Sequence, residues 1–207
     1  MTRSARRAIG AGAASRALAP ICIETVHAGT TWYRIHRAGR EPLWFGPAPG
    51  AAPEFRFDAP GGEYRICYLG ASPEASFAET LLRRPPVRLI ERAELAIRQL
   101  SSVVVLRELR LAALHGQGLA RAGVAGEVTM GLDYSRSRAA ALELWSHPER
   151  VDGISYQCRH DSGEIAIALF SRAHHPRAAL AVERTTPLMA DPLLLAAWAE
   201  RYGFGII

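Results

Sequence analysis

The stretch "CYLGASPEASFAETLL", from Cys67 to Leu82, predicts a buried strand, a break and a helix. The apolar and aromatic residues before Gly70 are typical of a strand, and glycine is a strong punctuator of regular structure. Ser72 is a good N-cap and Pro73 a good first helical residue, so the helix begins there. We expect this helix to end at about Arg83, ahead of a pair of prolines.

Tyr68 and Glu79 are the two residues of this stretch that raise a question of function. By its local pattern Tyr68 is a half-buried core aromatic at the end of the strand. Glu79 lies at the edge of the apolar arc of the helix, where a surface glutamate would pair with Arg83 one turn later. The alternative is that both side chains face one cleft and act there chemically.

Composition restricts the class of protein. The 207 residues favour one domain, and 49% hydrophobic residues are ample for a packed core. No apolar run approaches the ~18 residues that suggest a membrane span. Three widely spaced cysteines argue against a disulfide framework or a zinc site and for a reducing compartment, so we expect a cytoplasmic protein.

The net charge is +5, and every basic side chain is arginine, since the chain contains no lysine. Arginine forms planar, bidentate contacts with phosphate and carboxylate groups, which lysine cannot match. No dense basic block follows residue 16, so the charge alone gives little support to nucleic-acid binding.

The chain divides into a tail and one domain. Residues 1–20 are rich in arginine, alanine, serine and glycine and predict a disordered tail, and residues 21–207 predict the domain. The alternating segment "TTWYRIHR" predicts a strand that contains Arg34. Residues 39–62 predict a long loop rich in proline and glycine, of the kind that often forms a binding loop or lid.

The remaining elements alternate without a clean βαβ pattern. "VRLIERAEL" and "SSVVVLREL" predict strands, with a helix as an alternative at residues 91–99, and "GQGLARAG" predicts a short helix. A strong helix is expected over residues 134–147, and another after the N-cap Asp191. "DGISYQCRHDSGEIAIALF" predicts two strands joined by a turn. The fold class is therefore an α+β domain.

Arginines next to aromatic residues are the other candidates for a site. Arg34 follows Trp32 and Tyr33, and Arg56 lies within "FRF". Taken singly, such arginines usually lie at the surface, but together they suit a ligand that carries phosphate and stacks a ring. His174 and His175 have no second pair of ligands at metal spacing.

The order of these pieces resembles the RES-domain family, named for motif arginine, glutamate and serine residues. "WYRIHR", "FRFDAPGGEYRICYLGASPEASFAETL" and "DGISYQCRHDSGEIAIALF" carry the resemblance, over roughly residues 30–180. It implies a single ADP-ribosyltransferase-like domain with a mixed, mostly antiparallel sheet and flanking helices. Many members are toxins of toxin–antitoxin pairs of the RES–Xre type that act on NAD.

The resemblance also implies roles for particular residues. Arg34 and Arg56 look like the two motif arginines, Tyr68 like the strand tyrosine and Glu79 like the motif glutamate. Catalysis would then rest on Glu79, Arg34 and Tyr68. NAD would be bound by Arg34, Arg56, Tyr33, Tyr68 and Cys158. Cys158 stands where the family has serine in its third block, and Ser155 would point to the opposite face of that strand.

The function implied is cleavage of the nicotinamide–ribose bond of NAD by phosphorolysis or hydrolysis, with NAD as substrate, inorganic phosphate as a co-substrate and no metal. One alternative is ADP-ribosylation of a protein, which would use the same pocket. Another is a non-catalytic module that binds a ligand or nucleic acid. The family also implies an Xre-like antitoxin that covers the active site, and the oligomeric state stays open.

Overall fold

The structure, a computed structural model, describes residues 20–83, 89–172 and 178–207. The strands are β1 (Ile23–Val26), β2 (Thr31–Arg37), β3 (Ile66–Gly70), β4 (Leu89–Ile90), β5 (Arg98–Val105), β6 (Leu109–Leu114), β7 (Gly153–Cys158), β8 (Asp161–Phe170), β9 (Leu180–Pro187) and β10 (Gly205–Ile206). The helices are α1 (Pro73–Leu81), α2 (Arg92–Ala96), α3 (Gln117–Arg121), α4 (Glu127–Met130), α5 (Ser135–Ser146) and α6 (Pro192–Tyr202), with a 3-10 turn, η2 (Leu188–Ala190).

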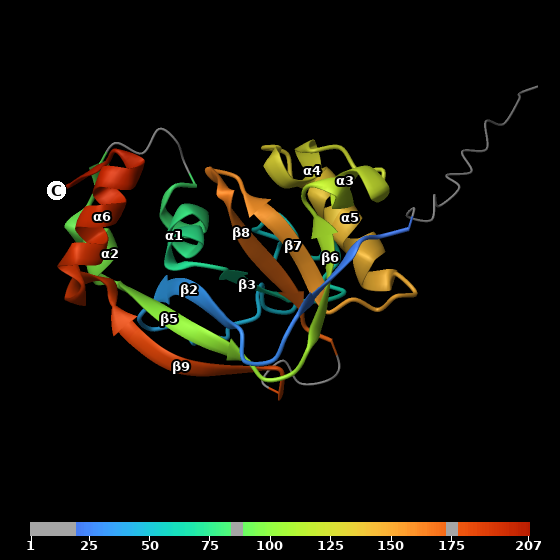
Figure 1. Ribbon diagram of the computed structural model, residues 1–207, viewed down its shortest axis with the longest axis horizontal. Coiled ribbons are helices and arrows are strands. Elements are labelled where there is room, and N and C mark those ends of the chain that lie inside the picture. Colours follow the sequence, from blue (N-terminus) through green and yellow to red (C-terminus); the bar gives the residue numbers. More distant parts are fainter. Residues whose placement is uncertain (1–19, 84–88, 173–177) are drawn as a thin grey trace, which may run out of the picture.

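One mixed sheet has the strand order β1-β6-β7-β8-β3-β2-β5-β9. Within it only β6 and β7 pair in parallel, and the other pairs of the described strands are antiparallel. In Figure 1, α1, α2 and α6 lie toward one end of the molecule and α3, α4 and α5 toward the other. The predicted fold class, an α+β domain with a mixed, mostly antiparallel sheet and flanking helices, is confirmed.

The core lies on both faces of this sheet. The larger cluster joins α1, α5 and α6 to the sheet through side chains such as Phe77, Leu144 and Trp198. The smaller cluster, on the opposite face, includes Trp32, Cys67 and residues of β5 and β6. Because successive strand residues point to opposite faces, neighbours such as Cys67 and Tyr68 belong to different clusters.

The junction of β3 and α1 is formed as the sequence predicts. The Ser72 side chain accepts a hydrogen bond from the N–H of Ala75 (2.9 Å), and Pro73 occupies the first turn. A Cβ at Gly70 would lie 2.6 Å from the backbone nitrogen of Ser76, so only glycine lets the helix pack this closely against the strand end. The helix ends at Leu81, two residues earlier than expected.

Other elements differ from the prediction. In the described part of "VRLIERAEL", Leu89–Ile90 form a strand shorter than predicted, and the helix α2 (Arg92–Ala96) lies where a helix over residues 91–99 was the alternative, because an apolar run this short fits either structure. The strands β1 and β9 were not predicted. The expected tail, apart from Pro20, and the histidines 174 and 175 lie outside the described residues. Within the described ranges, no helix combines the length and apolar character needed to cross a membrane.

Candidate functional site

A cavity of about 300 Å³ lies where β2 and β3 separate. These strands pair only through Tyr33 and Gly70. Beyond this pair of residues, β2 stays paired with β5 along its other edge, and β3 stays paired with β8 along its other edge. The edges of β2 and β3 that face each other are not paired there. The cavity is lined by β2, the end of β3, α1, the loop before β3 and the turn between β7 and β8.

Backbone groups of the two strands face this opening. The N–H of Ala38 donates to Ile97 and that of Val105 to Thr30, so even-numbered residues of β2 bond to β5. The N–H and C=O of Ile35 therefore point toward the opening. In β3, Ile66 exchanges two backbone hydrogen bonds with Gly46 on the edge away from β8. Tyr68, two residues later, directs its N–H and C=O to the same edge and therefore also toward the opening. Among the described strands, none pairs with Ile35 or Tyr68 on that side.

Glu79 points into this cavity and not into solvent. Its Oε2 accepts a hydrogen bond from the hydroxyl of Tyr156 (3.1 Å), and its Oε1 accepts one from the backbone N–H of Arg159 (3.2 Å). Burial raises the pKa of Glu79, while these two hydrogen bonds and the charges of Arg56 and Arg83 oppose the rise. The local expectation of an ion pair with Arg83 is not met, since the Arg83 guanidinium lies over the Phe55 ring instead.

Arg34 and Arg56 line the cavity and are both held by carbonyl groups. Arg34 Nη1 lies 2.9 Å from the carbonyl oxygen of Pro42 and 2.8 Å from that of Trp44. The same nitrogen lies 3.0 Å from the sulfur of Cys67. Arg56 is 8% exposed and donates to the carbonyl of Gly131 (3.0 Å). Neither guanidinium forms an ion pair with a carboxylate of the described residues, so both can contact an anionic ligand.

Three cavity-lining aromatic rings each have a guanidinium over one face. The guanidinium carbon of Arg40 lies 4.3 Å from the ring centroid of Trp44, that of Arg83 lies 4.6 Å from Phe55, and that of Arg56 lies 4.8 Å from Tyr134. Such contacts fix the orientation of long arginine side chains at a site. The cavity therefore combines positive charge with flat apolar surfaces.

Tyr68 holds the loop that carries Arg56. Its hydroxyl donates to Asp58 Oδ1 (3.2 Å) and accepts from the N–H of Phe57 (3.0 Å). Asp58 is completely buried, and its Oδ2 accepts from the N–H groups of Glu54 and Phe55. Burial and the nearby Asp58 raise the pKa of Tyr68, so the hydroxyl stays protonated. Tyr68 thus lines the cavity with its ring while its polar end organises the loop.

The structure brings together Arg34, Arg56, Tyr68 and Glu79, which all line this cavity. Tyr33 does not join them: it lines a separate hollow beside β9, although its pairing with Gly70 places it on the same sheet face as Tyr68. Cys158 does not line the cavity either. It is fully buried beneath α1, with its sulfur 3.9 Å from the carbonyl oxygen of Ala75. Burial and the nearby Glu79 raise the pKa of the Cys158 thiol, which favours its protonated form.

Tyr156, Arg159 and Asp58 also contribute to the site and were not predicted from the sequence. Tyr156 follows Ile154 and precedes Cys158 on one face of β7, so period-two alternation places it on the side on which Cys158 was expected. The signal was therefore available for Tyr156. The contribution of Arg159 to Glu79 is a backbone N–H, and that of Asp58 is a set of turn contacts, so neither follows from residue type.

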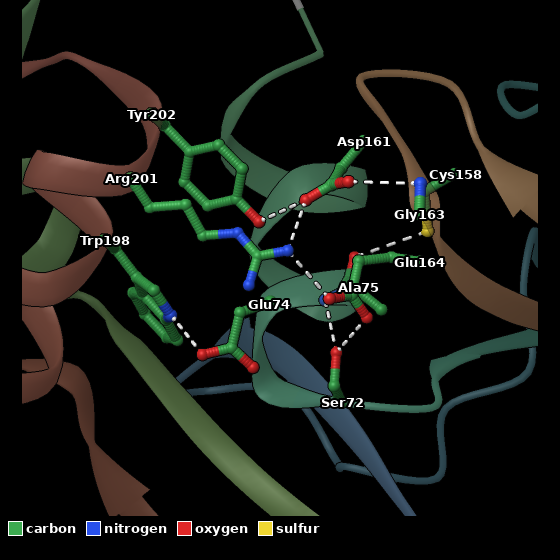
Figure 2. Close-up of polar contacts among 10 residues, drawn as sticks. All are labelled: Ser72, Glu74, Ala75, Cys158, Asp161, Gly163, Glu164, Trp198, Arg201 and Tyr202. Carbon is green, nitrogen blue, oxygen red and sulfur yellow. Dashed lines mark hydrogen bonds and ion pairs between the residues drawn. The ribbon is translucent and has the colours of Figure 1, made fainter.

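Helix α6 contacts the first turn of α1 and the start of β8 (Figure 2). Arg201 contacts Asp161 (2.8 Å) and Glu164 (2.9 Å), both on β8 just after the turn that contains Arg159. Trp198 donates from its indole nitrogen to Glu74 in the first turn of α1 (3.1 Å). Burial alone would raise the pKa of Asp161, but hydrogen bonds from Tyr202 and Arg201 outweigh it and keep that pKa below its ordinary value. We call these contacts the α6 clamp.

The described residues contain no cluster of three or more histidine, cysteine, aspartate or glutamate side chains placed to hold a metal ion. The site contains the hydrogen-bonded carboxylate of Glu79, several arginines and aromatic rings, and Glu54 and His160 also line it. This set of groups can bind a ligand with phosphate and ring systems and can stabilise positive charge that develops beside Glu79.

Comparison with known proteins agrees with the motifs in the sequence. No curated protein gives a significant match. Among solved structures, a chain of the M. tuberculosis MbcT–MbcA toxin–antitoxin complex has a TM-score of 0.60 and 19% identity, over 83% of this chain and 92% of that chain. At this identity the likeness concerns the fold. The RES domain matches residues 31–191. Because that match spans well over half of the chain, the protein belongs to the RES-domain family.

Proposed function

We propose that this protein cleaves the N-glycosidic bond between nicotinamide and ribose in NAD, with water or inorganic phosphate as the acceptor. The observation that carries the proposal is the setting of Glu79. Tyr156 and Arg159 hold this carboxylate at a cavity whose other charged groups are mainly arginines. The family resemblance supports the same substrate.

The chemistry requires little beyond such a carboxylate. When the bond between ribose C1′ and the nicotinamide nitrogen breaks, its electron pair neutralises the positive charge of the pyridinium ring, so no general acid is needed. Positive charge then develops on the ribose, as in glycoside hydrolysis. An ionised Glu79 beside that sugar stabilises the charge. The acceptor, water or phosphate, adds to C1′ and gives ADP-ribose or its 1-phosphate.

The remaining cavity groups suit the other parts of NAD. Arg34 and Arg56 would bind the pyrophosphate, and the rings of Tyr68 and Tyr134 would pack on ring systems of the ligand. The free N–H and C=O of Ile35 match the acceptor and donor of a carboxamide. His160 also lines the cavity, and burial together with Arg159 and Arg56 lowers its pKa, so its neutral ring can accept a proton from an attacking water.

The biological role that fits this reaction is that of a toxin with a protein antitoxin. Two observations support the role: the family to which the chain belongs, and the toxin–antitoxin complex among structures of similar fold. The antitoxin would be of the Xre type and would cover the active site, and the protein would act in the cytoplasm. Co-expression with the product of a neighbouring gene should restore cellular NAD if that product is the antitoxin.

The direct test is the Glu79→Gln variant assayed with labelled NAD. We expect a loss of NAD cleavage of roughly 100-fold or more, because glutamine cannot supply the negative charge. Folding should be preserved, since burial disfavours the ionised glutamate. The carbonyl oxygen of glutamine still accepts the hydrogen bond from the N–H of Arg159, and its NH2 group can donate to the hydroxyl oxygen of Tyr156. Undiminished NAD cleavage by a folded Glu79→Gln protein would remove Glu79 from the mechanism.

The products of the wild-type reaction distinguish the possible acceptors. Free ADP-ribose indicates hydrolysis, ADP-ribose 1-phosphate indicates phosphorolysis, and label on protein in a lysate indicates ADP-ribosylation. A wild-type protein that consumes no NAD in the presence of phosphate and lysate would contradict the proposal as a whole.

A further inference from the structure

The cavity has a second cationic end that Glu79 does not use. At the first end, Arg56 and Arg83 are the arginines whose charges act on Glu79. At the other end, where β2 finishes and β5 begins, Arg37 and Arg98 line the same cavity and influence each other electrostatically. The mechanism proposed above assigns no role to this pair.

Arg37 and Arg98 are direct cross-strand partners. The N–H of Ala38 donates to Ile97, so Arg37 and Arg98 form a non-hydrogen-bonded pair, the type in which facing side chains lie closest. Like charges placed directly opposite each other destabilise a sheet. Burial also lowers the pKa of Arg98, and the charge of Arg37 lowers it further, whereas Glu94 raises it.

The charge of this pair is only partly balanced within the described residues. Arg98 Nη2 contacts Glu94 Oε1 at 2.5 Å, and this is the one carboxylate that forms an ion pair with either arginine in that part of the chain. Arg98 is 9% exposed, and its buried Nε has no hydrogen-bond partner there. The guanidinium of Arg37 is exposed at the cavity rim. Within the described residues, the two adjacent guanidinium groups thus have one ion-pair acid between them, Glu94, which pairs with Arg98.

We propose that Arg37 and Arg98 form a second anion subsite, distinct from the Glu79 end, that takes a phosphate group. A phosphate dianion placed between two guanidinium groups offsets their repulsion and accepts charge-assisted hydrogen bonds from both. The phosphate comes either from a dinucleotide with a third phosphate, such as NADP, or from free inorganic phosphate. The first source rests on the proposed function, and the second does not.

Calorimetric titration of the Glu79→Gln protein tests the subsite without consuming the ligand. The probes are NAD, NADP and inorganic phosphate at constant ionic strength. Arg37→Gln removes one guanidinium from the exposed rim. Arg184→Gln, on the neighbouring strand β9, is the matched control, because Arg184 is also an exposed strand arginine but lines the other hollow. Thermal unfolding of each variant verifies the fold.

If the phosphate belongs to the dinucleotide, NADP binds roughly tenfold more tightly than NAD, and Arg37→Gln but not Arg184→Gln abolishes that difference. If it is free phosphate, NAD and NADP bind alike, and Arg37→Gln weakens phosphate binding by roughly tenfold relative to Arg184→Gln. Equal affinities of the two variants for all three probes overturn the subsite. Failure of the proposed function is read separately, from the absence of NAD cleavage by the wild-type protein, while the phosphate titration still reports on Arg37.

Discussion

Glu79 shows how one residue type can have either of two roles. In its own helix it has the position of a solvated acid, and only contacts with β7 and the following turn place it at a cavity. Its raised pKa means that ionisation is disfavoured in the folded protein. Stability therefore falls as the pH rises from the ordinary pKa of glutamate to the raised pKa in the folded protein, and it falls no further above that. Catalysis that needs the carboxylate is lost as the pH falls below the raised pKa.

The hydrogen bond from Tyr156 should set the acid limb of the activity profile. This bond lowers the pKa of Glu79 against the effect of burial, so Tyr156→Phe should raise that pKa further and move the acid limb of kcat to higher pH. We also expect a loss in kcat of roughly 10-fold at neutral pH, because a hydrogen bond to a charged group is worth about 1.5–3 kcal/mol. A pH–rate profile of both proteins measures this, and an unshifted acid limb would separate Tyr156 from the ionisation of Glu79.

At the residue scale, the order of the family motifs along the chain predicted the cavity-lining residues better than the local pattern around each residue did. Arg34, Arg56, Tyr68 and Glu79 all line one cavity, although each by itself had an ordinary structural explanation. The role of Asp58 was not predictable, because it depends on a turn whose backbone N–H groups converge on one carboxylate. Cys158 was assigned to the right strand face, but the depth of α1 over that face was unknown from sequence.

At the scale of elements, the α6 clamp connects the C-terminal helix to the site. It fixes the start of α1 through Glu74 and the start of β8 through Asp161, and these two elements flank the contacts of Glu79. Neither α6 nor its ion pairs touch the cavity. Their effect on chemistry would therefore be one of positioning.

Arg201→Met tests the clamp. It removes the contacts with Asp161 and Glu164 but keeps an apolar stem, so we expect Tm to fall by about 2–4 °C, the effect of about 1 kcal/mol in a protein of this size. Slight loosening of Glu79 should lower kcat several-fold and leave KM nearly unchanged. Arg110→Met is the control, because its ion pair with Glu149 is similarly exposed and neither residue lines the cavity. Equal kcat values in the two variants would show that the clamp is only structural.

Elements with strong local signals were predictable, and those that depend on neighbours were not. The helices at residues 73–81 and 192–202 both have a side-chain cap followed by proline, and both were expected. Strand β9 has mostly exposed residues and forms by pairing with β5, so its sequence carries no clear apolar alternation. Strands β2 and β3 pair through one pair of residues and then separate, and the cavity lies where they separate. The sequence of neither strand indicates where this pairing stops.

At the scale of the whole molecule, charge is concentrated where the sheet separates. Six arginines besides Arg98 line the cavity: Arg34, Arg37, Arg40, Arg56, Arg83 and Arg159. No salt bridge to an acid of the described residues involves any of these six. A positive, partly enclosed site raises the local concentration of an anionic substrate.

Salt should therefore weaken the binding of NAD. We expect the KM for NAD to rise about threefold or more between ~50 and ~300 mM NaCl, since screening reduces the attraction of partly exposed charges. Inhibition by nicotinamide, which is neutral, provides the control and should depend little on salt. Equal salt dependence for both would mean that the arginines do not contribute through their charge.

The separation of β2 from β3 also determines how the backbone exchanges its amide hydrogens. Ile35 and Tyr68 lie within strands near the middle of the sheet, yet their N–H groups face the opening and not a neighbouring strand. These two amides should exchange with deuterium much faster than those of Arg34 and Leu69, which bond to β5 and β8. A ligand that fills the opening would slow the exchange of both amides at once. Hydrogen exchange at Ile35 and Tyr68 would therefore report whether a ligand is bound.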